Sequence, residues 1–204
     1  MAETKLNSAP GALAEETDER LMAVFQGGND AAYDLLVRRY KDQLLNFAFR
    51  YLGDRDDAGD VVQETFVRLY YKKASYRPVA RFSTWLYTIT TNLAKSQLRR
   101  RRRRSFFSLD RKGMRDERPQ EIPDSRNSPD LEAGRSIQHE HIQRALDAIG
   151  AKYREIVILR DVQDLSYEEV CAITGLNMGT VKSRLNRARA QLRELLKDLR
   201  EEPA

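Results

Sequence analysis

Carboxylates recur every four residues along one stretch of the sequence, at Asp56, Asp60 and Glu64, with Asp57 and Gln63 beside them. Residues four apart share one face of an α-helix, so this spacing predicts an acidic row on a helix. Three interpretations are open. The acids favour the positive end of the helix dipole, which explains the first turn but not Glu64. They hold the metal of a nuclease, for which one helical face offers poor coordination geometry. Or they dock a basic partner helix, which explains the whole row.

A second set of side chains has the chemistry to hold an unpaired nucleotide. An aromatic ring, an amide and cations follow one line at helical spacing, at Trp85, Thr88, Asn92, Lys95 and Arg99. An indole can stack on a base, an amide can hydrogen-bond its edge, and cations can hold the phosphate backbone. The alternatives are ordinary core packing for Trp85 and solvent exposure for Asn92 and Lys95. Arg99 also begins a run of six arginines, residues 99–104, which favours phosphate contact over base reading.

The sequence near the C-terminus predicts two short helices joined by a tight turn. Ser166 and Glu169 are spaced as a capping box, which marks the start of a helix. Gly175 suits the left-handed residue that ends this helix, and Asn177 can cap the next one. Two helices on either side of so short a turn form a helix-turn-helix. Cys171 is expected to be a small buried side chain of this hairpin.

The second helix of the hairpin has a polar face that suits a DNA major groove. Its apolar side chains are expected to form one buried stripe, made of Val181, Leu185, Ala188, Leu192, Leu195 and Leu199. The candidate DNA contacts lie away from that stripe, at Thr180, Lys182, Ser183, Arg184 and Arg187. Arginine reads guanine edges bidentately, and the other side chains reach phosphates or base edges. The alternative is a helical hairpin whose basic face is merely solvated.

Four earlier helices are expected to position the first two sets of residues. Apolar residues at 3.6-residue spacing predict a short helix ending at Gly27, a long one ending at Gly53, a third from about Asp56 to Ala74, and a fourth capped by Ser83. Periodicity stops between about residues 105 and 133 and then resumes. No strand-like alternation persists, so we expect an all-α fold of two small helical domains joined by a flexible linker.

These patterns divide the chain into a disordered N-terminal tail (1–17), a first domain (18–104), a linker (105–133) and a second domain (134–204). The net charge of +5 makes a polyanionic partner plausible. Cys171 is the only cysteine, which excludes an internal disulfide and a multi-cysteine metal site. No apolar run is long enough to cross a bilayer, so we expect a cytoplasmic protein without membrane insertion and without a cofactor.

Three groups of motifs, taken in chain order, resemble the extracytoplasmic-function sigma factors of the sigma-70 family. They are DVVQETF at residues 60–66, FSTWLY at 82–87 followed by Asn92, and LSYEE at 165–169 followed by GTVKSRLNRAR at 179–189. One motif alone would be modest evidence, but three groups in the order of the family are specific, and the similarity spans about residues 20–200. The resemblance implies a region-two domain, a linker in place of the middle domain of larger relatives, and a region-four domain.

The resemblance also implies a function and a role for each set of residues. The chain would be a non-enzymatic subunit that binds core RNA polymerase and directs promoter-specific transcription initiation. Its contacts to the beta-prime clamp helices would be Asp57, Asp60, Gln63 and Glu64. Its minus-ten contacts would be Tyr76, Trp85, Thr88, Ile89, Asn92, Lys95 and Arg99. Its minus-thirty-five contacts would be Thr180, Lys182, Ser183, Arg184 and Arg187.

Further partners implied by the resemblance are the beta flap of the polymerase, promoter DNA and an anti-sigma factor. Housekeeping relatives carry a tryptophan pair where this chain has Thr88 and Ile89, which implies melting at a narrower set of promoters. Two other functions remain as alternatives. A stand-alone helix-turn-helix regulator normally needs a dimerisation segment, and no heptad pattern offers one. A metal-dependent nuclease is supported only by the carboxylate row.

Overall fold

The computed structural model describes residues 13–109 and 129–197, and these residues form eight α-helices without a β-strand. The predicted all-α fold is therefore confirmed. The first four helices are α2 (Asp18–Gln26), α3 (Asp30–Leu52), α4 (Arg55–Tyr71) and α5 (Phe82–Leu109). The last four are α6 (Pro129–Ala148), α7 (Ala151–Val157), α8 (Tyr167–Thr174) and α9 (Met178–Leu195). A 3₁₀ turn, η1 (Lys73–Ser75), follows α4, and a π-helical turn, η2 (Ile158–Val162), follows α7.

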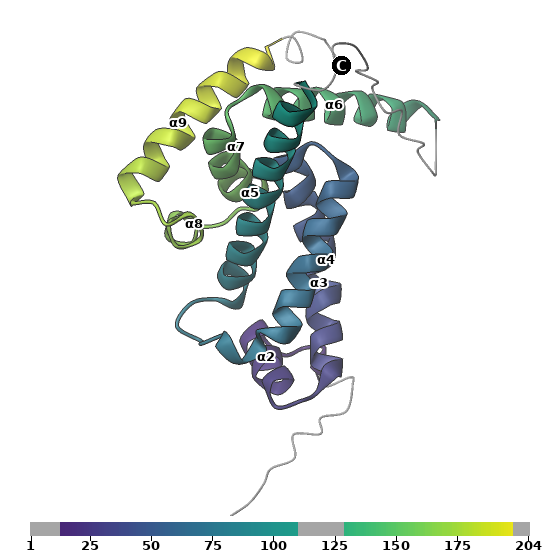
Figure 1. Ribbon diagram of the computed structural model, residues 1–204, viewed down its shortest axis with the longest axis vertical. Helices are drawn as coiled ribbons and strands as arrows, with labels where there is room; N and C mark the ends of the chain where they lie inside the picture. The colour runs from purple at the N-terminus through teal and green to yellow at the C-terminus, as the bar shows by residue number, and fades with distance from the viewer. Residues whose placement is uncertain (1–12, 110–128, 198–204) are drawn as a thin grey trace, which may run out of the picture.

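The N-terminal half, residues 13–109, is built on three long helices that run side by side, with α2 packed across one end (Figure 1). Side-chain caps begin three of its helices: Thr17 caps α2, Asn29 caps α3 and Asp54 caps α4. Each cap accepts a hydrogen bond from a backbone N–H of the first turn, where helical partners are missing. The predicted inward face of α4 is buried as expected, and its members are Ala58, Val61, Val62, Thr65, Phe66 and Leu69.

Several predicted boundaries of the N-terminal half were wrong. The third helix ends at Tyr71, and the residues up to Ser75 form η1 instead. Ser83 does not cap α5, because the helix already begins at Phe82, whose N–H donates to the Glu19 carboxylate of α2 at 3.0 Å. A cap from another element cannot be recognised from local spacing. Leu13, which was assigned to the tail, is buried in the core.

The C-terminal half, residues 129–197, contains the expected helix-turn-helix. The reciprocal capping box of Ser166 and Glu169 is present at the start of α8. Gly175 ends that helix in the left-handed conformation with φ 72°, which favours glycine because it has no Cβ. Asn177 accepts from the Thr180 N–H at 2.8 Å and caps α9. The predicted caps of α8 and α9 and the predicted turn at Gly175 are therefore confirmed.

Two helices extend into the segment that was predicted to be a linker, because α5 runs to Leu109 and α6 begins at Pro129. The predicted linker residues between them and the predicted tail before Leu13 lie outside the described residues. The apolar stripe of α9 is shorter than expected. Val181, Leu185 and Ala188 are buried, but Leu195 is exposed, and Leu199 lies outside the described residues.

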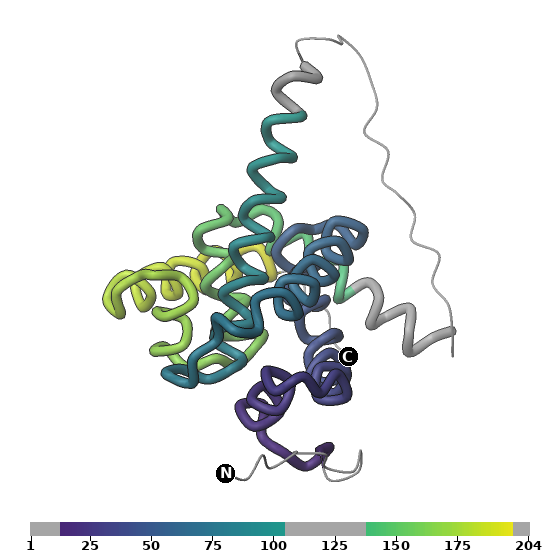
Figure 2. The backbone as a smooth tube through the Cα atoms, turned by 60° about the horizontal axis from the view of Figure 1, so that its bottom comes forward, coloured from purple at the N-terminus to yellow at the C-terminus, as the bar shows by residue number. Residues whose placement is uncertain are grey.

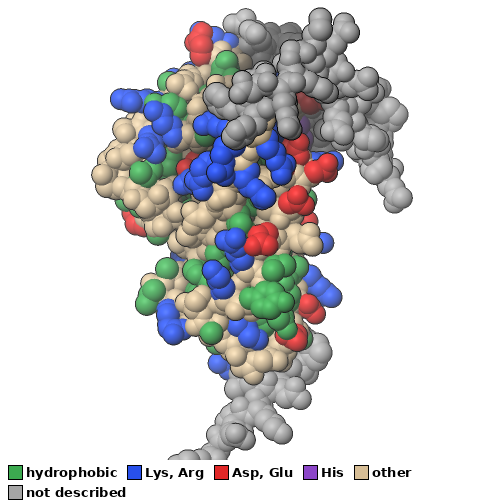
Figure 3. Space-filling model, in the orientation of Figure 1, with side chains coloured by type: hydrophobic (Ala, Val, Ile, Leu, Met, Phe, Trp, Pro, Cys, Tyr) green, Lys and Arg blue, Asp and Glu red, His purple; other side chains and the backbone are tan. Residues whose placement is uncertain are grey.

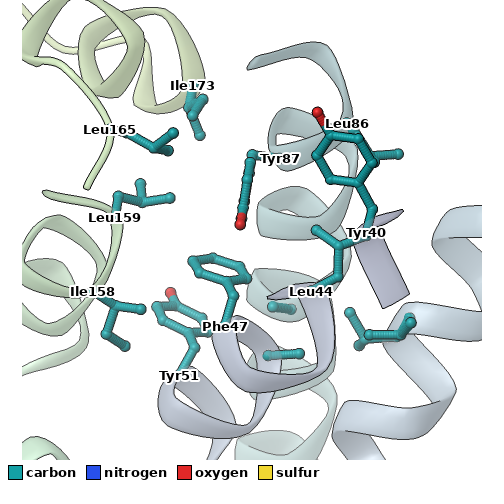
Figure 4. Close-up of a cluster of buried hydrophobic side chains, with 14 of the residues drawn as sticks. Tyr40, Leu44, Phe47, Tyr51, Leu86, Tyr87, Ile158, Leu159, Leu165 and Ile173 are labelled. Carbon is teal, nitrogen blue, oxygen red and sulfur yellow. The ribbon is translucent and has the colours of Figure 1, made fainter. Parts of the chain in front are cut away.

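The two halves share one contiguous hydrophobic core, where the sequence favoured two small cores. From the N-terminal half come Phe47 and Tyr51 of α3 and Leu86 and Tyr87 of α5, and from the C-terminal half come Ile158, Leu159, Leu165 and Ile173. We call these eight residues the shared core. In Figure 4 the Tyr87 and Phe47 rings lie between the two sets of side chains. Figure 2, in which the molecule is turned by 60°, also shows α7, α8 and α9 packed against α5.

Polar side chains of the C-terminal half also cap the end of α3. Gly53 ends that helix with φ 71°, and a Cβ there would lie only 2.9 Å from an oxygen of Asp147. Arg154 pairs with Asp147 at 2.7 Å and donates to the Tyr51 carbonyl at 2.9 Å. Gln143 donates to the Arg50 carbonyl at 3.3 Å. The last carbonyls of a helix lack helical partners and favour a nearby cation. The two halves are therefore joined by directed contacts as well as by apolar burial.

Candidate nucleic-acid and protein interfaces

The outer face of α9 presents polar and cationic side chains on a helix that is anchored by its buried stripe. Lys182, Ser183 and Arg187 are exposed, while Thr180 and Arg184 are half-buried. Ser183 donates its hydroxyl proton to the Thr180 carbonyl at 3.0 Å. The helix therefore places Thr180, Ser183, Arg184 and Arg187 on one outer face, and Lys182 flanks it. A free helical face of this kind fits the width of a major groove.

Neighbouring helices hold two of these cations at the edge of the face. The pKa of Tyr153 in α7 is lowered, first because of a hydrogen bond with Arg187. The ammonium of Lys182 lies 5.6 Å from the centre of the Tyr167 ring in α8, a cation–π distance. Arg189, in contrast, forms a two-point ion pair with Asp161, at 2.6 and 2.9 Å. Its charge is turned toward η2 and away from the open face.

Aromatic rings cluster where the loop before α5 meets the start of that helix. Tyr76 is 4% exposed, and its ring centre lies 5.3 Å from that of Trp85 and 5.8 Å from that of Phe82. Trp85 is half-buried against this cluster. Tyr76 is thus packed in the core, and only a rearrangement would let it line an open base pocket. Trp85 packs against the core and remains partly accessible to solvent.

Further along α5, the residues of the predicted line differ in their exposure to solvent. Asn92 and Arg99 are exposed, and Thr88 and Ile89 are half-buried. The Thr88 hydroxyl donates to the Thr84 carbonyl at 2.8 Å, a bond within the helix. Asn92 and Arg99 are therefore the open members of the line, and Asn92 is the one with an amide that can hydrogen-bond a base edge.

Lys95 has a partner that the sequence did not predict. Its ammonium lies 2.7 Å from a carboxylate oxygen of Glu155 in α7, and Glu155 is only 4% exposed. The charge of Lys95 offsets part of the cost of burying this carboxylate. A candidate nucleic-acid contact of the N-terminal half is thus occupied by the C-terminal half.

The acidic row on α4 is only partly as predicted. Asp60, Gln63 and Glu64 are exposed on one face of the helix, and Glu64 pairs with Arg68 at 2.8 Å. Asp57 is half-buried, and one of its carboxylate oxygens accepts a hydrogen bond from Gln97 of α5 at 2.5 Å. Asp57 therefore joins α4 to α5 and is not a free member of the row.

The same face of α4 continues into exposed apolar side chains. Val67 lies one turn beyond Gln63 and Glu64, and Tyr71, 81% exposed, lies one turn further. Figure 3 shows hydrophobic side chains gathered over the lower part of α4, and Lys and Arg side chains gathered where α5 rises beside the C-terminal half. Clustered exposed apolar side chains mark a surface that binds a partner. The spacing from Gln63 to Tyr71 was visible in the sequence, but only the row of acids was selected from it.

Sequence reasoning also missed the residues that join the halves. Tyr87 donates its hydroxyl proton to the Gln163 amide oxygen at 2.6 Å, and burial raises the pKa of this phenol. One signal for this contact existed. Residues 156–159, Ile-Val-Ile-Leu, are apolar without a break, which indicates a helix covered on more than one side. A helix-turn-helix packed only on itself would leave part of such a run in water.

Within residues 13–109 and 129–197, no group of three or more His, Cys, Asp or Glu side chains is placed to hold a metal ion. Over the same residues, no helix combines the length and the apolarity that a membrane span requires.

Comparison with known proteins finds two family models in chain order. Sigma-70 region 2 matches residues 36–104, and Sigma-70, region 4 matches residues 139–192. Among curated proteins, ECF RNA polymerase sigma factor SigE of Mycolicibacterium smegmatis is 39% identical over 183 residues. That match covers 85% of this chain and 66% of the relative, so the chain spans just under two thirds of that protein.

A second curated relative and a solved structure match over nearly their full length. ECF RNA polymerase sigma factor SigW of Bacillus subtilis is 32% identical, with 89% of this chain and 97% of the relative covered. The sigma factor RpoE of Bartonella quintana, solved in complex with the anti-sigma factor NepR, has a TM-score of 0.65 and 32% sequence identity. That comparison covers 81% of this chain and 96% of the solved chain.

Proposed function

This chain belongs to the extracytoplasmic-function group of the sigma-70 family, and we propose that separate surfaces of it bind core RNA polymerase and the two promoter elements. Members of this family bind core polymerase and direct promoter-specific initiation, and they are not enzymes. The observation that carries the proposal is the pair of region matches in chain order, each on a half that presents an exposed polar face.

We assign recognition of the minus-thirty-five element to α9. Its open face carries cations and hydroxyls at the positions where a recognition helix meets base edges and phosphates. We expect Arg184→Ala to lower promoter use about tenfold when transcription depends on the upstream element, because one bidentate arginine contact is worth about 1–3 kcal/mol. Run-off transcription with core polymerase measures this effect. Binding to core polymerase should not change, and weaker binding there would contradict the assignment.

The minus-ten element is assigned to the exposed side of α5. Asn92 offers an amide for the edge of an unstacked base, and Trp85, two turns earlier on the same helix, offers a partly exposed ring. We expect Asn92→Ala to reduce discrimination about fivefold at one position of the minus-ten element, with little change at the others. Initiation from a set of promoters that differ by single bases checks this. Equal weakening at every base would indicate a phosphate contact.

The polymerase-binding surface is assigned to the outer face of α4. Its exposed acids and amide, Asp60, Gln63 and Glu64, suit a basic helix, and Val67 and Tyr71 continue the face with apolar area. Charged contacts orient such a complex, and buried aromatic side chains stabilise it. Asp57 supports this surface indirectly, because it fixes α4 against α5 through Gln97.

An anti-sigma factor is a further proposed partner, since a related sigma factor has been solved with one. We also propose that the chain acts in the cytoplasm, where its relatives would meet RNA polymerase. The test of the whole proposal is transcription by purified core polymerase on a randomised promoter library. Selected start sites that require this chain would support it. A footprint by the chain alone, unchanged by core polymerase, would favour a stand-alone regulator instead.

A further inference from the structure

Two tyrosines outside the recognition helix contact cations of the surface assigned to the minus-thirty-five element. The ammonium of Lys182 lies 5.6 Å from the centre of the Tyr167 ring in α8. Tyr153 of α7 forms a hydrogen bond with Arg187. Tyr167 belongs to the helix-turn-helix, whereas Tyr153 lies in the helix before it. The helix α7 therefore supplies a contact to the outer face of α9.

Tyr153 accepts this hydrogen bond and Arg187 donates it. An arginine side chain has N–H donors and no acceptor, so the acceptor is the phenol oxygen. Such a bond stabilises the phenolate more than the phenol, and it is the first cause of the lowered pKa of Tyr153. The ammonium of Lys152, 4.9 Å from the centre of the Tyr153 ring, lowers this pKa further. The phenol oxygen is thus a directed acceptor beside the cations of α9.

Arg187 keeps its charge in this contact. A protonated phenol is neutral, so it orients a guanidinium without cancelling its charge. Arg189, two residues further along the same helix, is instead paired with the carboxylate of Asp161. Arg187 is exposed, and it forms no ion pair within residues 13–109 and 129–197. Arg187 is therefore oriented by the protein and still available to DNA.

Tyr153 is itself held in place by the packing of α7. Its ring is half-buried against the hydrophobic core. The next residue, Arg154, is buried and joins α7 to the end of α3 through the Tyr51 carbonyl. The same helix packs along α9. A side chain on a helix that is fixed in this way can determine the position of its hydrogen-bond partner.

Orientation matters for Arg187 because an arginine side chain is long and flexible. Ordering such a side chain on binding lowers the affinity, and ordering it beforehand removes that cost. Two-point reading of a guanine also requires the plane of the guanidinium to match the base edge. A phenol that binds one N–H leaves the other N–H groups free for that edge.

We propose that Tyr153 is a positioning residue that aims the Arg187 guanidinium at one base pair of the minus-thirty-five element. The proposal rests on the function proposed above and deepens it, because it extends promoter reading from the helix-turn-helix to the helix before it. Loss of the phenol oxygen should lower discrimination at the base pair that Arg187 reads. The other base pairs of the element should be read as before, since the remaining side chains of α9 are unchanged.

The test uses holoenzyme reconstituted from core polymerase and the full chain, and run-off transcription measures initiation. The templates carry the promoter selected from the randomised library, with each minus-thirty-five base pair changed in turn. The variants are Tyr153→Phe, Arg187→Ala and the two together. The matched control is Tyr33→Phe, which also removes one phenol hydrogen bond, to the Phe66 carbonyl at 3.2 Å in the N-terminal half. Both phenylalanine variants keep the ring, so circular dichroism should show the same helix content.

We expect Arg187→Ala to lower discrimination at one base pair about 20-fold, and Tyr153→Phe to lower it about fivefold at that same base pair. In the Arg187→Ala background, Tyr153→Phe should have no further effect, because contacts that act through one another are not additive. Tyr33→Phe should leave discrimination unchanged at every base pair. A purely structural role for Tyr153 would weaken all base pairs alike or add to the effect of Arg187→Ala, and either result would overturn the proposal.

The wild-type holoenzyme separates this proposal from the proposed function. If it fails to start transcription, the proposed function is refuted. If it starts transcription but Tyr153→Phe and Arg187→Ala do not affect the same base pair, only the positioning role of Tyr153 is refuted.

Discussion

Replacing Phe47 with alanine is expected to lower the free energy of unfolding by about 3–5 kcal/mol, because a fully buried phenylalanine loses both its burial and its packing partners. Phe47 is 0% exposed. Its ring stacks on that of Tyr51 with centres 6.1 Å apart and meets that of Tyr87 edge-on at 5.5 Å. Such aromatic pairs add stability beyond the buried area. Thermal unfolding followed by circular dichroism should show the midpoint falling by roughly 6–20 °C.

The matched control for Phe47→Ala is Val79→Ala. Val79 is 92% exposed in the loop before α5, so its loss should change the free energy of unfolding by less than about 0.5 kcal/mol. Because the shared core includes both halves, Phe47→Ala should lower the midpoint of thermal unfolding, and the whole chain should still unfold in one transition. A variant in which only part of the helical signal melts earlier would show that the halves unfold independently.

The elements and caps of this fold could be predicted from the sequence because their causes are local. The capping box of Ser166 and Glu169, the left-handed Gly175 and the Asn177 cap each depend on residues within a few positions of one another. The buried face of α4 follows from helical periodicity in the same way. Such features need no knowledge of the tertiary structure.

Contacts between distant residues could not be predicted in this way. Glu19 provides the hydrogen bond at the start of α5, and Arg154 caps the end of α3, from positions far away in the chain. Both side chains are charged, and charged residues are usually expected at the surface. The burial of Arg154 and the half-buried position of Glu19 are intelligible only once the helix ends that they stabilise are in place.

The sequence predicted which residues of each candidate site lie on the same helix, but not which other side chains pack against them. On α9 four of the five selected residues, Thr180, Ser183, Arg184 and Arg187, share the outer face and Lys182 flanks it, because the buried stripe determines which side of one helix remains free. On α5 the selection mixed exposed Asn92 with paired Lys95, because Glu155 of the other half covers that part of the helix. Tyr76, in the loop before α5, is buried against Phe82 and Trp85 of its own half. Helical spacing identifies residues on one face, but it does not show what lies against that face.

The second large effect is expected at the polymerase-binding surface, from reversing both exposed acids of α4 in Asp60→Lys with Glu64→Lys. We expect affinity for core polymerase to fall roughly 100-fold, about 2.7 kcal/mol, because two attractive contacts with a basic helix become repulsive. Both side chains are exposed, and the Glu64 pair with Arg68 is a surface contact worth little, so the fold should persist. Competition binding against a labelled sigma factor measures the affinity, and run-off transcription should fall with it.

Two comparisons separate a docking surface from a general effect of charge. The neutral pair Asp60→Asn with Glu64→Gln should give an intermediate loss, and added salt should reduce the difference between variants because exposed charges are screened. Reversing two exposed acids of the C-terminal half, Glu140→Lys with Glu194→Lys, makes the same charge change away from α4. If this control weakens core binding as much as the α4 reversal does, net charge determines the affinity and the assigned surface is wrong. If only the α4 variants respond, the acids act at a defined contact, and Val67→Ser and Tyr71→Ser can then test its apolar continuation.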